Sequence, residues 1–454
     1  MSHNLKLTNN VKIFLMLFFY LGNILLPFSQ PPFANMTFPI SLFFWSVPVA
    51  FIVFSKILIK KINLTELPFF IFLLSSLLSL FYLLNINFSI DIFMSFFQRF
   101  FALLCGLSVY LVVINRFCYL VSLNKIKNCF MLSFLPVALY GLFIQVPAAC
   151  GFQNFIIINR FIRSLVTYFY VDIGRLSWLA SEPSFAAFQI ASVMCILLLD
   201  RLSILRKVYL MILIVSLLFT KSIYGLLLLI PFIFLFFYSL FYNGQIVKLL
   251  IVIILLILCL VSLWKWSPNQ GFMYRLKYIT HDASAVQRFI LIKSTIIAGI
   301  KTYGIGVGIG EYQHRWRDFI NKDSSLLAYS TPALRKKLNY TIAGNYKPYS
   351  VIGGLWAEMG LVGLVVIFLP FFYIIKRLSI LKKYNKLQRI KLLVCLSIIF
   401  ITFLGAYPVS MPNMWYLMGI LVLETNIRIN PVDLASLKER RRTKFGWVRN
   451  YAVR

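Results

Sequence analysis

The chain has 454 residues, of which 61% are hydrophobic and 17% are aromatic. Apolar stretches long enough to cross a bilayer core of about 30 Å recur along it, and this composition excludes a soluble globular protein. The net charge of +32 also suggests nucleic acid, but most of it follows from membrane orientation and a basic tail beside anionic lipid. We therefore expect membrane lipid as a partner and no nucleic acid.

The apolar pattern predicts an all-α polytopic membrane protein with about twelve transmembrane helices, forming a single domain over residues 1–454. The seventh and last spans are short, so the expected range is eleven to thirteen. The first span is expected to remain in the protein, because no small-residue cleavage site follows it. The expected spans are 11–29, 37–59, 67–84, 92–114, 128–147, 184–200, 207–220, 222–242, 246–264, 351–375, 391–408 and 412–427.

Basic residues predict the orientation of these spans. The short connections at 30–36, 85–91 and 409–411 contain no lysine or arginine, whereas the intervening connections are basic. The positive-inside rule then predicts that both termini are cytoplasmic, including the basic tail at 428–454.

Two predicted outer segments are long, a first large periplasmic loop at 148–183 and a second at 265–350. Both carry an excess of basic residues, which the positive-inside rule permits in long loops but does not require. This cationic outer face favours an anionic ligand, and we expect the functional residues there.

The first outer loop ends in GRLSWLASEPSF, residues 174–185. Pro183 suits the first position of a helix, so Ser181 or Glu182 is expected to cap the outer end of the sixth span. The partial positive charge of this helix end would favour either the Glu182 carboxylate or a bound phosphate, with Arg175 a short loop away. The alternative is a plain helix cap with a balancing ion pair.

The second outer loop contains a capping-box pattern at Ser284 and Gln287, which predicts a helix running to about residue 302. Its apolar stripe indicates a helix at the membrane surface, and Arg288 lies off that stripe, facing either a cavity or solvent. The stripe consists of Val286, Phe289, Ile292, Ile296 and Ile300.

The glycines of GIGVGIGEYQHRWRDF, residues 304–319, do not predict a dinucleotide site, because no strand of a βαβ unit precedes them. Tight backbone bends beside the bilayer or a sugar are the expected reason for them. In the tenth span, Glu358 must be paired or line a cavity, and a structural pair with Arg99 is one alternative. Lys221, at an outer helix end, is a further phosphate contact.

The seven cysteines show no paired spacing, and no metal-binding motif is present. We expect no disulfide framework, no metal and no other cofactor. The loop aromatics could stack on sugars or, singly, anchor the chain at the membrane interface. They are Trp178, Tyr303, Tyr312 and Trp316.

These motifs and their order resemble the O-antigen polymerase and O-antigen ligase superfamily. The resemblance rests on GRLSWLASEPSF after the fifth span, SIYG after the seventh, QRFILIKSTI and GIGVGIGEY in the large outer loop, and WAEMGLVG entering the tenth. It implies a GT-C-like fold and metal-independent transfer of glycan from undecaprenyl pyrophosphate, at the periplasmic face of a bacterial inner membrane. By position, Arg175 and Arg288 match the family's arginines that hold the pyrophosphate.

Ligases of this superfamily place a histidine just before the tenth span, where this chain reads YKPYSVI. This departure favours a polymerase that joins lipid-linked oligosaccharide repeats, with a chain-length regulator and a flippase as implied partners. Glu182 is the leading candidate base for the acceptor hydroxyl, and His314 is the alternative. An O-antigen ligase and a lipid-glycan flippase or transporter remain alternatives. The candidate substrate-binding residues are Arg160, Arg163, Lys221, Arg315, Lys347 and Glu358.

Overall fold

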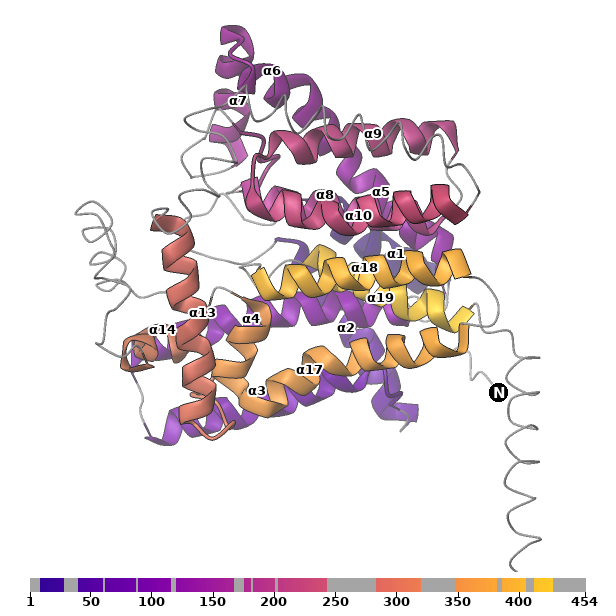
Figure 1. The fold of residues 1–454 in the computed structure, drawn as a ribbon. Helices are drawn as coiled ribbons and strands as arrows, with labels where there is room; N and C mark the ends of the chain where they lie inside the picture. The colour runs from indigo at the N-terminus through magenta and orange to yellow at the C-terminus, as the bar shows by residue number, and fades with distance from the viewer. Residues whose placement is uncertain are drawn as a thin grey trace, which may run out of the picture.

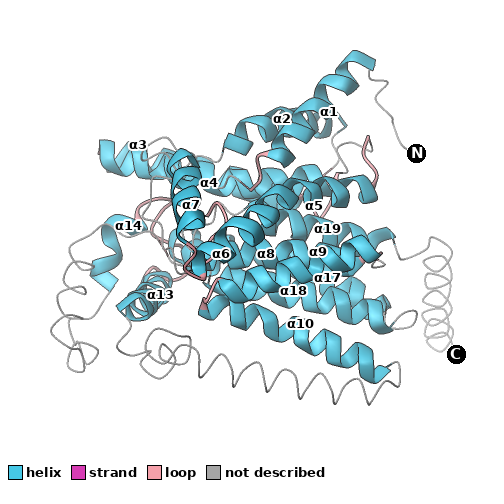
Figure 2. Cartoon of the chain, turned by 90° about the horizontal axis from the view of Figure 1, so that it is seen from above, coloured by secondary structure: helices cyan, strands magenta, loops and turns pink. Residues whose placement is uncertain are grey.

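The computed structural model describes residues 9–27, 40–59, 62–86, 89–115, 120–166, 175–180, 183–200, 203–242, 283–319, 348, 350–381, 386–405 and 412–427, and this part of the chain contains no strand. Its elements are α1 (Asn9–Ile24), α2 (Ile40–Ile59), α3 (Leu67–Ile86), α4 (Ile90–Ile114), α5 (Leu123–Tyr140), the π-helical turn η1 (Gly141–Gln145), α6 (Val146–Ala149), α7 (Gln153–Val166), α8 (Pro183–Leu199), α9 (Ile204–Phe219), α10 (Ile223–Tyr242), α13 (Ala283–Lys301), α14 (Tyr312–Arg315), the 3₁₀ turn η2 (Trp316–Phe319), α17 (Val351–Leu381), α18 (Lys386–Gly405) and α19 (Pro412–Ile427). Figures 1 and 2 show α8, α9, α10, α17, α18 and α19 running side by side along one common direction.

Each expected span overlaps one of these helices, except 246–264, which lies outside the described residues. In the described part of the chain, six helices are long and apolar enough to cross a membrane, and the apolar helices Phe44–Lys56 and Pro183–Leu199 are shorter. Length and composition therefore support a multi-pass helical membrane protein, while the count of twelve spans and the GT-C-like fold stay predictions. The six long helices are Leu67–Asn85, Ile90–Ile114, Leu123–Ala149, Ile223–Phe241, Val351–Ile380 and Lys386–Gly405.

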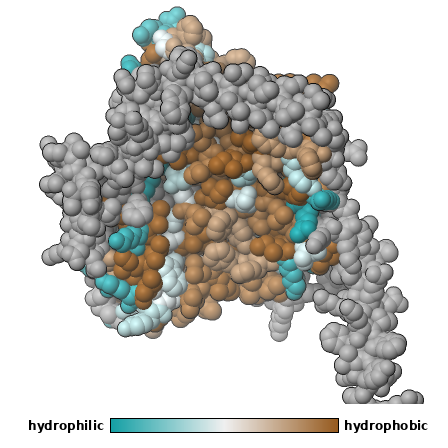
Figure 3. All heavy atoms as spheres, viewed as in Figure 1, coloured by the Kyte–Doolittle hydropathy of each residue, from teal (hydrophilic) through white to brown (hydrophobic). Residues whose placement is uncertain are grey.

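The outside of the bundle is apolar. On α3, the side chains of Leu74, Leu77, Leu78 and Phe81 are all exposed. Figure 3 shows a broad hydrophobic surface across the middle of the bundle, with hydrophilic residues towards its left and right ends. An apolar surface of this extent is unfavourable in water and is what a lipid-facing surface requires.

The centre of the bundle is formed by α8, α19 and the second half of α4, whose side chains are buried on nearly all sides. Small residues let α4 and α19 approach closely, as is common between helices in membranes. A side chain at Gly106 would overlap the Trp415 ring, and one at Gly419 would lie 2.8 Å from Val113 Cγ1.

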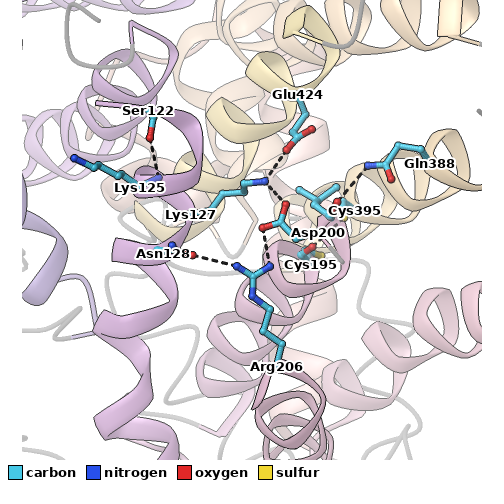
Figure 4. A network of polar contacts seen from close by, with 11 residues as sticks. Ser122, Lys125, Lys127, Asn128, Cys195, Asp200, Arg206, Gln388, Cys395 and Glu424 are labelled. Atoms are coloured by element: carbon cyan, nitrogen blue, oxygen red, sulfur yellow. Dashed lines mark hydrogen bonds and ion pairs between the residues drawn. The ribbon is translucent and has the colours of Figure 1, made fainter. Parts of the chain in front are cut away.

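One end of the bundle is held by a buried polar network, which we call the Lys127 network (Figure 4). Lys127 Nζ donates to Glu424 Oε1 at 2.9 Å and also to the Asp200 carboxylate, which Arg206 Nη1 contacts at 2.9 Å. Lys127 is only 2% exposed. The start of α5, the end of α8, the start of α9 and the end of α19 therefore meet here. Successive spans were predicted to alternate between the two sides of the membrane, and that alternation places these four helix ends on the same side. Which side is cytoplasmic stays a prediction.

Among the described helices, α13 and α7 do not run along the common direction of the long helices (Figure 1). The expected loop helix is confirmed as α13, which runs across the direction of the long helices (Figure 1). Ile296 and Ile300 of its predicted stripe are exposed, whereas Leu291, Ser294 and Ala298 are buried. α13 therefore packs against α17 and η2 with one face and leaves part of the apolar stripe outward, as a helix at a membrane surface does.

The second such helix, α7, follows the short α6 and was not predicted. It exposes large apolar side chains and buries two polar ones, unlike a helix in water. Ile157 and Phe161 are each 64% exposed, whereas Asn159 and Arg163 are buried. The buried side of α7 faces the loop that precedes α8.

Candidate functional site

The loop at residues 175–180 is fixed by two buried polar side chains. Arg163 of α7, 1% exposed, donates from Nη2 to the Ala180 carbonyl at 3.0 Å and from Nη1 to the Trp178 carbonyl at 3.3 Å and to Ser177 Oγ. Gln145, at the end of η1, accepts from Trp178 N at 2.8 Å and donates to its carbonyl at 2.9 Å. These contacts set the path of the chain from Arg175 towards the start of α8.

Arg175 ties this loop to the connection between α9 and α10. Its Nε donates to the Thr220 carbonyl at 3.1 Å, and its Nη2 donates to the Lys221 carbonyl at 3.3 Å. The next amide, of Leu176, donates to the Phe219 carbonyl at 2.9 Å. Arg175 is partly buried and Lys221 is exposed. We call residues 220–225 the TKSIYG turn.

Arg288 of α13 reaches the same TKSIYG turn from another direction. Its Cζ lies 5.5 Å from the centroid of the Tyr224 ring, in the first turn of α10. Ser222 Oγ accepts from the Gly225 amide at 2.8 Å, as a helix-capping serine does, and so fixes the start of α10. The structure thus brings Arg175, Lys221 and Arg288 to one turn, although they come from separate parts of the sequence.

A second polar group lies between α4 and α17. Arg99 Nε and Glu358 Oε2 are 2.8 Å apart, and both side chains are buried. The expected structural pair is therefore confirmed. Glu358 Oε1 also accepts from the Gly310 amide at 3.4 Å. Within the described contacts, Glu358 binds protein groups, and its predicted substrate role stays a prediction.

The glycine-rich segment packs against α17 where that helix is broken. Gly360 has φ 61 and ψ −140, and the Val307 and Gly308 amides donate to the Ala357 and Glu358 carbonyls at 2.8 and 3.0 Å. A Cβ on Gly306 would lie 2.5 Å from the Glu358 carbonyl oxygen. The predicted tight bends are therefore present. They are needed because this segment lies close to the backbone of α17.

His314 lies beside α4. Its Nε2 is 2.8 Å from Ser95 Oγ and 3.2 Å from Gln313 Nε2. Burial lowers the pKa of His314 below its ordinary value, although the Asp91 carboxylate opposes this shift. The neutral imidazole, which can accept a proton, is therefore favoured at neutral pH. In the described part of the chain, its contacts are with α4 and Gln313, not with the TKSIYG turn.

The remaining predicted site residues lie in different settings. Arg160 is exposed on α7. Arg315 is about half exposed and lies 3.7 Å from Glu311, whose pKa is raised by burial. Glu182 and Lys347 lie outside the described residues. α8 does begin at Pro183, as expected, while its predicted cap cannot be placed from the described chain.

The loop aromatics were expected to stack on sugars or to anchor the chain at the membrane interface, and for three of them this expectation is wrong. Trp178, Tyr312 and Trp316 are completely buried, so they neither face a sugar nor anchor the chain at the interface. Trp178 has φ 51 and packs into the loop held by Gln145. Tyr303, by contrast, is 93% exposed.

Sequence reasoning missed Gln145, Ser95 and Tyr224 as residues of these sites. Gln145 carried a signal, because a polar amide near the end of an apolar span needs a partner. Tyr224 lies in the SIYG motif, but nothing in the motif indicated that its ring would meet Arg288.

The described residues contain no group of three histidine, cysteine, aspartate or glutamate side chains that could hold a metal ion. No protein-family model matches the chain, and no curated protein matches its sequence.

Proposed function

We propose that this protein is an O-antigen or related surface-polysaccharide polymerase, a glycosyltransferase that joins undecaprenyl-pyrophosphate-linked oligosaccharide repeats. The observation that carries the proposal is the contact of both Arg175 and Arg288 with the TKSIYG turn. Two guanidinium groups and the exposed Lys221 ammonium at one turn form a cationic centre suited to a diphosphate.

The chemistry needs positive charge where the leaving group forms. An acceptor hydroxyl attacks the anomeric carbon of the donor sugar, and the bond between that carbon and the pyrophosphate oxygen breaks. The bonding electrons pass to the departing pyrophosphate, and the hydroxyl proton passes to a base. Arginine N–H groups can stabilise the growing charge on the phosphate oxygens by bidentate hydrogen bonds.

The described partners of the two arginines suit this task. Arg175 contacts backbone carbonyls, and Arg288 contacts a tyrosine ring. These contacts orient the two guanidinium groups at the TKSIYG turn. The nearby start of α10 adds the partial positive charge of a helix N-terminus.

Glu182 remains the leading candidate base in this proposal. Arg163 holds the Ala180 carbonyl, so the chain that leads from Arg175 to Glu182 starts from a fixed position. His314 is the alternative, supported by its lowered pKa. We further propose that Arg160, Arg315 and Lys347 add charge around the lipid-linked substrates.

We also propose that the TKSIYG turn faces the periplasm and that both termini are cytoplasmic. α9 starts beside the Lys127 network, where Arg206 binds Asp200, and ends at Phe219, next to Thr220 of the TKSIYG turn. The turn therefore lies at the opposite end of α9 from the network. The protein would reside in a bacterial inner membrane beside a flippase and a chain-length regulator.

The test is a reconstituted reaction. Purified protein in lipid vesicles receives labelled undecaprenyl-pyrophosphate repeats, and product length is measured by gel electrophoresis. Chain lengthening supports the proposal, whereas translocation without new glycosidic bonds identifies a flippase. Arg175→Ala and Arg288→Ala should each abolish lengthening. Arg377→Ala is the matched control, because Arg377 also stacks on a tyrosine, with its Cζ 5.3 Å from the Tyr373 ring centroid.

A gene deletion separates polymerase from ligase. Loss of a polymerase leaves lipopolysaccharide capped by a single repeat, whereas loss of a ligase leaves no repeat on the lipid A core. The second pattern would overturn the proposal in favour of the ligase.

A further inference from the structure

The Tyr224 ring is held from three sides. Its centroid lies 5.3 Å from that of Phe188 on α8. On α18, Gly405 provides the space for it, since any side chain there would overlap the ring. The Arg288 guanidinium lies over the ring from α13, with Cζ 5.5 Å from the centroid. The ring therefore stands where α8, α10, α13 and α18 meet.

The contact between Arg288 and Tyr224 differs from an ion pair. An aromatic ring attracts a cation through its negative face. A carboxylate would bind the N–H groups of the guanidinium and cancel its charge. A ring contacts the face of the guanidinium and not its edge, where the N–H groups that bind phosphate oxygens in pairs lie. An aliphatic side chain of similar size would fill the space but would not attract the cation.

The same turn also carries Arg175. Thr220 and Lys221 accept hydrogen bonds from Arg175, and Tyr224 follows three residues after Lys221. The backbone of this turn is set by Lys221, at φ 46, and by the capping Ser222. One rigid turn thus fixes the relative placement of the two guanidinium groups, by backbone carbonyls on one side and a ring on the other.

We propose that Tyr224 is a positioning residue: the face of its ring holds the Arg288 guanidinium in place for a diphosphate bound beside Arg175. This inference rests on the proposed function, because it assigns Tyr224 a part in the same diphosphate site. Tyr224 does not touch the substrate in this role. It acts through Arg288, and the aromatic ring is the required feature, rather than the hydroxyl group.

The experiment measures binding of undecaprenyl pyrophosphate to the full-length protein in lipid nanodiscs. Tyr224→Phe keeps the ring and should bind within about twofold of the parent protein, whereas Tyr224→Leu should weaken binding about five- to tenfold. Tyr373→Leu is the matched control, since it removes the corresponding ring beneath Arg377, and it should leave binding unchanged.

Tyr224→Leu could also disturb the packing against Phe188, so a second series keeps the shape. Phenylalanine with one, two or three ring fluorines is incorporated at position 224. Fluorine withdraws electrons from the ring face, so affinity should fall stepwise with each fluorine. In an Arg288→Ala background the same series should be flat, because the partner is gone.

The outcomes distinguish the inference from the function on which it rests. A flat fluorine series in the parent protein, together with weakened but measurable binding in Arg288→Ala, overturns the role of Tyr224 and leaves the diphosphate site standing. Unchanged binding in Arg288→Ala overturns both. A stepwise fall that disappears in Arg288→Ala supports the positioning role.

Discussion

Arg99 of α4 and Glu358 of α17 form a buried ion pair, with 2.8 Å between Nε and Oε2, at the level where the segment 304–310 packs against both helices. Removal of one partner leaves a charge buried without its counter-ion. We expect Arg99→Leu or Glu358→Leu to lower the free energy of unfolding by about 3 to 5 kcal/mol, measured by denaturant titration in detergent.

The double variant Arg99→Leu/Glu358→Leu should recover most of that loss, because apolar residues can fill the site without an unpaired charge. Additive losses in the double variant would show that the two side chains do not act as a pair.

The Lys127 network predicts a second stability effect. Lys127→Met removes a cation that the buried Glu424 carboxylate contacts at 2.9 Å, while Asp200 keeps Arg206. We expect a loss of about 3 to 5 kcal/mol, seen as a lower denaturation midpoint in detergent. Lys125→Met is the control, since Lys125 lies on the same helix and is exposed. Equal effects of the two substitutions would contradict the pairing.

The pKa of His314 separates the two candidate bases. A general base acts in its unprotonated form, and burial lowers the pKa of His314 from its ordinary value of about 6.5. If His314 is the base, polymerisation should stay constant as pH falls to about 6.5 and decline only below it, and His314→Gln should abolish it. If Glu182 is the base, Glu182→Gln abolishes polymerisation and His314→Gln leaves it nearly intact. Initial rates across pH 5 to 8, about the range in which histidine titrates, decide between them.

Gly306 provides a test of the close packing at the break in α17. Gly306 and Gly151 have nearly the same backbone angle, with φ 92 and 95. Alanine at either position incurs the strain of a left-handed backbone, about 1 to 2 kcal/mol. Only at Gly306 would the added Cβ also meet backbone, 2.5 Å from the Glu358 carbonyl oxygen, whereas nothing lies within 4 Å at Gly151.

Gly306→Ala should therefore destabilise the protein more than Gly151→Ala, by about 1 to 3 kcal/mol for the enforced overlap. Unfolding of both variants under identical detergent conditions gives the difference. A difference near zero would mean that the loop moves away from α17 at little cost.

Hydrophobic runs predicted the helices well, because a helix in lipid must be apolar over most of its length. The partnership of Arg99 with Glu358 was also foreseeable, since a charge within a span needs a counter-charge. The burial of Lys127 was not, because in sequence it resembles any cation at the inner end of a span. Its partners Asp200 and Glu424 are separated from it by several helices and meet it only in the fold.

The candidate site shows the same division. Its cationic character was predicted from composition, and the assignment of Arg175 and Arg288 to one site was what the resemblance implied. That both arginines contact the TKSIYG turn could not be predicted, because a contact with a backbone carbonyl or with a ring face leaves no pattern in a single sequence. The glycines at 304–310 were read correctly as bends, but the backbone they approach could only come from the packing of α4 and α17.

The exposed apolar residues of α7 have a practical consequence. Ile157 and Phe161 face outward, and Arg163, on the other side, holds the loop at residues 175–180. The surroundings of the protein therefore act on this loop through one short helix. We expect extraction that strips lipid from α7 to loosen the contacts of Arg163 before the bundle unfolds, so a preparation can retain its helices and still lose the order of this loop.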